Sequence, residues 1–176
     1  MFKGKISITS LVFSSLLVAI SIVCGKYLAV NVGPVLRFSF ENLPILLAGI
    51  FFGPLLGALV GVVADLIGCV LVGFAVNPMV TIGAASIGAI GGAVYMLMKR
   101  SPMALKTVIS VFVAHIIGSV VIKTVGLASF YQFPFMVLMA YRALNYLIVG
   151  AVESLLLILI LKHKGIRNLL KNGDKL

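Results

Sequence analysis

Long apolar segments broken by glycine, alanine and serine follow one another along the chain. Their spacing matches neither a soluble amphipathic helix nor the alternation of a barrel strand. A membrane-spanning helix needs about 20 apolar residues, and all but one of the segments reach that length. The pattern predicts a single domain covering residues 1–176, an all-α integral membrane protein whose six transmembrane segments are 7–29, 43–52, 55–73, 79–98, 107–125 and 135–161.

Composition supports this fold class. The chain is 62% hydrophobic and 10% charged, whereas soluble domains hold roughly 45–50% apolar and about 25% charged residues. The net charge of +10 would suggest nucleic-acid binding if the cations covered a solvated surface. They instead cluster at the ends of apolar segments, so we attribute them to membrane topology and expect no nucleic-acid partner.

Most basic residues fall on one side of the predicted helices. Because cytoplasmic loops of membrane proteins are enriched in lysine and arginine, we expect both termini to lie in the cytoplasm and the chain to be a multi-pass protein of a bacterial cell membrane. No cleavage site follows the first apolar run, which favours a retained first helix over a signal peptide. The residues used for this orientation are Lys3, Lys5, Lys99, Arg100, Lys106, Lys162, Lys164, Arg167, Lys171 and Lys175.

Four cations depart from that distribution and lie toward the opposite face: Lys26, Arg37, Lys123 and Arg142. A charge within a membrane costs about 2.5–3.5 kcal/mol on insertion scales and is by default a functional candidate. Lys26 and Lys123 could instead extend to the interface. Arg142 lies deeper, and its guanidinium suits a carboxylate of a substrate or of the chain itself. Together the four predict a positive pocket open to the outside.

Aromatic and amide residues gather toward the same face. The candidates are Phe38 and Tyr131, with Asn42, Asn77 and Asn145. Aromatic clusters at this depth can simply form the interfacial belt. The same rings beside amides also suit a planar heteroaromatic ligand rich in hydrogen-bond donors and acceptors.

The remaining polar residues within the apolar segments allow structural interpretations. Asp65 shares a helix face with Gly53, Gly57 and Gly61, which predicts a packed face. Asp65 itself could complete a buried hydrogen-bond network or hold the amino group of a ligand. His115 is expected to be a satisfied buried histidine, and Glu153 lies too far along its helix to pair with Arg142.

Small residues on the first helix form a second candidate surface. Ser21, Gly25 and Ala29 repeat at a spacing of four, which lets another helix approach closely. That helix could belong to a separate membrane subunit or to this chain. Ala84, Gly88 and Gly92 repeat the spacing and are expected to pack internally.

Motifs of catalysis are missing from the sequence. It contains no phosphate-binding GxxxxGK[ST] loop, no HExxH or GxSxG motif, and no cysteine and histidine cluster with metal-ligand spacing. We therefore expect no enzyme, no cofactor, no metal and no catalytic residue, and ATP hydrolysis would have to occur on another polypeptide.

One string of residues is specific enough to indicate a family. Residues 37–44 read Arg-Phe-Ser-Phe-Glu-Asn-Leu-Pro. With 48–54, 61–65, 123–127 and 141–146, this string resembles the S-components of energy-coupling factor (ECF) transporters, and it is most similar to their folate-specific, FolT-type branch. The resemblance covers nearly the whole chain. Where the family usually has alanine on the first helix, this chain has Ser21 and Gly25.

The resemblance implies a function and partners. It implies six helices that bind folate near the outer face, and toppling of the subunit in the membrane to deliver it. It also implies a transmembrane coupling protein, the T-component, and two cytoplasmic ATPases, with the first helix contacting the coupling protein. An S-component for pantothenate or another acidic vitamin is the nearest alternative. A stand-alone carrier or channel is a third, although no clear internal repeat favours it.

Overall fold

The structure is a computed structural model that describes residues 7–32, 36–163 and 165, with only the backbone at 31, 32, 36, 37 and 131. Its elements are α-helices α1 to α7, π-helices η1 and η2, and strands β1 and β2. In chain order they are α1 Ile8–Ile22, η1 Val23–Tyr27, β1 Val30–Val32, β2 Leu36–Phe38, α2 Asn42–Phe52, α3 Pro54–Leu71, α4 Pro78–Leu97, α5 Met103–Ala114, η2 His115–Ile122, α6 Lys123–Tyr131 and α7 Phe135–Lys162.

These elements form six continuous helical segments in the described part of the chain, which confirms the six predicted helices. The π-helices are continuations: η1 extends α1, and η2 joins α5 to α6. Five segments are long and apolar enough to span a membrane, and Asn42–Phe52 is the short one. Gly53, with φ of 95°, separates α2 from α3 as the Gly-Pro pair predicts.

The structure differs from the sequence prediction in two connections between helices. The predicted helices 107–125 and 135–161 leave residues 126–134 outside a helix, but α6 continues to Tyr131. Gly126 does not break this helix; a Cβ there would lie 2.5 Å from Cβ of Met79, so the glycine allows α6 to pack closely on α4. The connection between the predicted helices 7–29 and 43–52 contains an antiparallel hairpin in which Val30 pairs with Phe38 and Val32 with Leu36.

Glycines hold α2, α3 and α4 close together, as the small-residue spacing predicts. A Cβ on Gly57 would lie 2.6 Å from Cα of Gly49 and 2.7 Å from the carbonyl oxygen of Gly88. Helices can approach this closely only where both lack side chains, and such contacts drive association within a membrane. The apolar core continues from here to Leu46, Ile87 and Leu157, which are fully buried.

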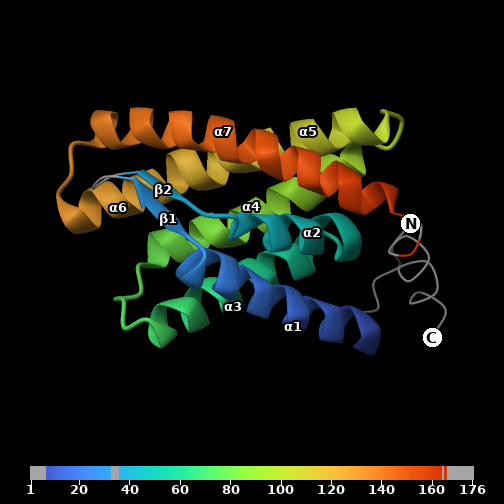
Figure 1. Cartoon of the computed structure of the whole chain (residues 1–176), viewed down its shortest axis with the longest axis horizontal. Helices are drawn as coiled ribbons and strands as arrows, with labels where there is room; N and C mark the ends of the chain where they lie inside the picture. Colours follow the sequence, from blue (N-terminus) through green and yellow to red (C-terminus); the bar gives the residue numbers. More distant parts are fainter. Residues whose placement is uncertain (1–6, 33–35, 164, 166–176) are drawn as a thin grey trace.

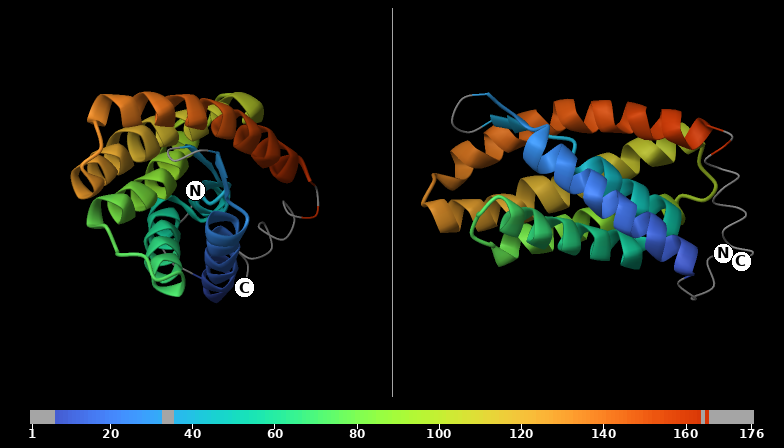
Figure 2. Two further views of the ribbon diagram at one scale, coloured as in Figure 1. Left: turned by 60° about the vertical axis from the view of Figure 1, so that its left-hand side comes forward. Right: turned by 60° about the horizontal axis from the view of Figure 1, so that its bottom comes forward.

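The helices connect alternately at two ends of the bundle (Figures 1 and 2). The start of α1, the α4–α5 connection and the end of α7 lie at one end. The β1–β2 hairpin and the α3–α4 and α6–α7 connections lie at the other, which we call the hairpin end. Lys99 and Arg100, in the α4–α5 connection, are therefore at the end where the described chain begins and finishes.

Candidate functional site

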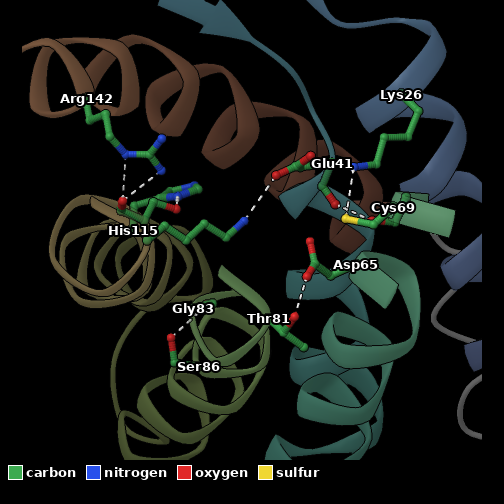
Figure 3. A network of polar contacts seen from close by, with 12 residues as sticks. Lys26, Glu41, Asp65, Cys69, Thr81, Gly83, Ser86, His115 and Arg142 are labelled. Carbon is green, nitrogen blue, oxygen red and sulfur yellow. Dashed lines mark hydrogen bonds and ion pairs between the residues drawn. The ribbon is translucent and has the colours of Figure 1, made fainter. Parts of the chain in front are cut away.

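A small cavity of about 20 Å³ with four charged side chains in its wall lies between α1, α3, α4 and α6. Lys26 comes from η1, Glu41 from the residue before α2, Asp65 from α3 and Lys123 from the first residue of α6. Figure 3 shows the labelled residues Lys26, Glu41 and Asp65 around this space. Two cations and two acids thus meet from four elements distant in sequence.

Lys123 and Glu41 form an ion pair across the cavity. Nζ of Lys123 donates to Oε1 of Glu41 at 3.1 Å, although the residues are 82 positions apart. The Lys123 residue is only 4% exposed, so it does not extend to the interface, and that alternative is wrong. Glu41 is fixed in turn by its backbone carbonyl, which accepts a hydrogen bond from Oγ of Ser21 at 2.7 Å.

Asp65 and Lys26 contribute the second acid and cation. Oδ2 of Asp65 accepts a hydrogen bond from Oγ1 of Thr81 at 2.6 Å, which ties α3 to α4. Nζ of Lys26 lies 3.9 Å from Sγ of Cys69 and 5.7 Å from the ring centroid of Phe74. The sulfur and the ring offer weak interactions, so the Lys26 ammonium is poorly matched by these two contacts.

Arg142 is held by a backbone carbonyl. Its Nε and Nη2 both donate to the carbonyl oxygen of Ser119 in η2, at 3.0 and 2.9 Å. Its Cζ also lies 5.3 Å from the ring centroid of Tyr146. Both salt bridges found among the described residues, His115 with Glu153 and Lys123 with Glu41, leave Arg142 out. Its guanidinium charge is therefore not offset by a described carboxylate.

His115 and Glu153 form a buried pair beside Arg142. Nε2 of His115 lies 2.6 Å from Oε2 of Glu153, and the side chains are 1% and 0% exposed. The prediction of a satisfied buried histidine is confirmed, as is the prediction that Glu153 does not pair with Arg142. The pair itself cannot be deduced from the sequence, because the partners are 38 residues apart on η2 and α7.

The three predicted amides have different environments. Asn77 caps α4 by accepting from the backbone N–H of Met79, and its Nδ2 donates to the carbonyl of Gly126. Its side chain thus has a structural role within the chain, and the predicted substrate contact of Asn77 stays a prediction. Asn42 is fully buried at the start of α2, and neither of its side-chain atoms has a hydrogen-bond partner among the described residues. Asn145 is buried on α7.

The other predicted substrate-binding residues lie at the hairpin end. Phe38 ends β2 and is partly exposed. Arg37 is also in β2, opposite Asn31, but its side chain lies outside the described residues, as does that of Tyr131. Among the predicted residues whose side chains the structure describes, only Lys123 lines the cavity. Glu41, also in its wall, was missed as a site residue.

Two of the three residues in the predicted partner surface on the first helix are buried. Ser21 and Gly25 are buried and line the cavity. A Cβ on Gly25 would lie 2.7 Å from Oε2 of Glu41, so this glycine makes room for the Glu41 side chain. Ala29 lies beyond η1, in the connection to β1. Ser21 and Gly25 therefore pack within this chain, which was the other interpretation of their spacing.

Comparison with known families decides what kind of protein this is. The profile described as "ECF transporter, substrate-specific component" matches residues 9–161. The chain belongs to this family. The S-component fold that the sequence resemblance implied is thus confirmed, and with it a multi-pass membrane protein.

Solved structures of S-components agree with the fold. "Crystal structure of FolT bound with folic acid" matches with a TM-score of 0.69 and 21% identity, covering 96% of this chain and 95% of that one. "Structure and mechanism of the S component of a bacterial ECF transporter" matches with a TM-score of 0.71 and 26% identity, covering 93% and 98%. No curated protein matches the sequence.

Proposed function

We propose that this S-component binds folate, or a closely related anionic vitamin, at the hairpin end, and that this end faces the outside of the cell. The observation that carries the proposal is Arg142, a guanidinium toward the hairpin end whose charge no described carboxylate offsets. A charge held this way favours an anionic ligand, and the planar guanidinium suits a carboxylate.

Folate has two chemically distinct ends that the site can distinguish. Its benzoyl-glutamate part carries two carboxylates, for which Arg142 and Lys123 are the described candidates and Arg37 the predicted third. Its pterin part is planar and presents adjacent N–H donors, which suit a carboxylate such as Asp65 at the cavity wall. The similarity to a structure of FolT bound with folic acid is a further, weaker support, because the identity is only 21%.

A ligand of this size requires a rearrangement at the hairpin end. The cavity of about 20 Å³ is far smaller than the roughly 300–1,000 Å³ of typical ligand pockets. Its wall includes the Lys123–Glu41 ion pair, and Glu41 follows directly on the segment that carries the hairpin. Separation of this pair would release a cation for the substrate and enlarge the space.

We further propose that transport depends on other subunits. The family named by the matching profile is the substrate-specific component of a transporter. The sequence has no phosphate-binding loop, so a coupling T-component and two cytoplasmic ATPases would supply the energy for toppling and release. With the hairpin end outside, the opposite end, which carries Lys99 and Arg100, is cytoplasmic, as the distribution of basic residues favours.

Equilibrium binding to the purified chain tests the substrate. Folate, pantothenate and an uncharged vitamin would be titrated in detergent, and the absorbance of the protein as purified would reveal a pterin. We expect folate to bind most tightly. Tighter binding of pantothenate would assign the site to that vitamin, and preference for the uncharged ligand would refute an anion site.

A further inference from the structure

Glu153 and His115 are an unusual pair to find inside an apolar bundle. The acid is fully buried, the histidine is 1% exposed, and their closest atoms are 2.6 Å apart. The other oxygen of Glu153, Oε1, has no hydrogen-bond partner among the described residues. Desolvating such a pair is costly and an unsatisfied carboxylate oxygen adds to the cost, so stability alone is a poor reason for it. Ionisable residues within membrane segments are by default functional.

A chain of contacts leads from this pair to Arg142. Nδ1 of His115 lies 3.2 Å from Oγ of Ser119, the residue whose backbone carbonyl accepts both hydrogen bonds from Arg142. The His115 ring also stacks on Tyr146, with ring centroids 4.8 Å apart and an angle of 25° between the ring planes. The face of Tyr146 in turn lies 5.3 Å from Cζ of Arg142. Both supports of Arg142 thus contact His115.

The hydrogen bonds assign a definite role to each ring nitrogen. A carboxylate oxygen accepts, so we assign the proton to Nε2 of His115, which donates to Glu153. Nδ1 then accepts from the Ser119 hydroxyl. Glu153 therefore fixes both the tautomer and the orientation of His115, in the way that a carboxylate orients a histidine in many functional sites.

We propose that His115 and Glu153 are positioning residues for Arg142. They hold Ser119 and Tyr146, and through these the guanidinium, in the geometry that meets a substrate carboxylate. This inference rests on the proposed function, in which Arg142 contacts the anionic part of the ligand. Figure 3 shows Arg142 and His115 on neighbouring helices, with the dashed contacts of Arg142 directed toward the segment that carries His115.

Glu153→Gln tests the inference with little change in shape. The amide removes the charge and weakens the restraint on the His115 tautomer. Because residues in one contact network are usually coupled only in part, we expect folate affinity to fall about three- to tenfold, in the lower part of the range for such couplings. In an Arg142→Ala background the same change should have no further effect. A pterin fragment without the benzoyl-glutamate should bind equally well to both proteins.

Ser119→Ala provides a second test that leaves the pair intact. It removes the hydroxyl that contacts His115 but keeps the carbonyl that holds Arg142. Folate affinity should again fall, and again only when Arg142 is present. Ser110→Ala is the matched control: Ser110 is equally buried in the same continuous helix, but its hydroxyl bonds to the carbonyl of Lys106, away from Arg142. That variant should bind folate normally.

The outcomes separate this inference from the proposed function. The inference would be overturned if Glu153→Gln weakened folate and the pterin fragment equally, or if it weakened folate equally with and without Arg142. The pair would then have a merely structural role, while the proposal of folate binding would stand. If no folate binds, the unfolding temperatures of the native protein, of Glu153→Gln, of Arg142→Ala and of the double variant would be compared in detergent without ligand. Non-additive shifts there support positioning although the substrate assignment has failed, and additive shifts refute it.

Discussion

Arg142 and Lys123 show how one type of charge can be held in two ways within the bundle. Lys123 is paired with the Glu41 carboxylate at 3.1 Å, so its charge is largely balanced by the chain itself. Arg142 is held by a neutral carbonyl and an aromatic face, which orient the guanidinium without neutralising it. The two residues should therefore respond differently to substitution.

Arg142→Ala should weaken folate binding selectively. Loss of a hydrogen bond between charged groups costs about 1.5–3 kcal/mol, which corresponds to roughly a tenfold or larger increase in Kd. Arg142→Lys should recover only part of this, because lysine keeps the charge but lacks the planar pair of donors. Equilibrium titration of each variant with folate and with the pterin fragment measures these changes in Kd. Equal weakening of the two ligands would remove Arg142 as a carboxylate contact.

Glu41→Gln should have the opposite effect on the same ligand. The substitution frees Lys123 for a substrate carboxylate, so folate affinity should rise by about tenfold, comparable to one charge-assisted hydrogen bond. The thermal stability of the protein alone should fall, because a buried cation loses its partner. The pterin fragment, having no carboxylate, serves as control and should bind unchanged. Weaker folate binding would mean that Glu41 itself contacts the ligand.

At the level of the helices, small residues determine how closely the helices pack. The backbones of α3 and α4 meet at Gly57 and Gly88, and that contact places Asp65 near Thr81. The cavity depends on this contact, because its wall includes Gly61, Asp65 and Ala84 from the same two helices. Loss of close packing should therefore affect both stability and binding.

Gly88→Ala should destabilise the bundle measurably. The added Cβ would meet the backbone of Gly57, which cannot move aside as a flexible side chain can. Overpacking of this kind typically costs about 1–3 kcal/mol. Gly150→Ala in α7 is the matched control, because its nearest neighbours would be side-chain atoms at 3.4 Å. Thermal unfolding in detergent would measure the stability of the two variants. Similar unfolding temperatures for both variants would contradict the close helix contact.

Most of the helices could be predicted from the sequence, and the segments that were predicted wrongly have physical explanations. The length of apolar segments identifies helices because a bilayer sets that length. It does not reveal that Gly126 continues a helix, since the reason is a close contact with Met79 on another element. The hairpin was missed because three-residue strands carry too little periodicity to be distinguished from a loop.

The site was predictable only as a set of candidates. An isolated charge in an apolar segment is visible in the sequence, so Lys123, Arg142 and Asp65 could all be singled out. Which of them meet cannot be deduced, because Glu41 and Lys123 are 82 residues apart. For the same reason, the sequence does not decide whether Ser21 and Gly25 face a separate subunit or this chain, in which they line the cavity.

At the scale of the whole molecule, the proposed topology can be tested directly. The start of α1, the end of α7 and the connection with Lys99 and Arg100 share one end of the bundle, opposite the hairpin. Ser101→Cys should react with a membrane-impermeant maleimide only after cells are broken, and Phe40→Cys should react in intact cells. The experiment uses a background in which Cys24 and Cys69 are replaced by serine. The reverse pattern would invert the proposed orientation.

The whole chain should bind its substrate without being able to concentrate it. It contains no phosphate-binding loop, and the four charged side chains around the cavity offer a ligand site but no source of energy. In liposomes that contain only this protein, labelled folate should bind saturably yet never exceed its external concentration inside. Addition of a T-component with its two ATPases and ATP should produce accumulation. The control is Arg142→Ala, which should lower uptake by the full complex in proportion to the loss of binding. Accumulation by the chain alone would instead identify a stand-alone carrier, and the coupling proposed here would be wrong.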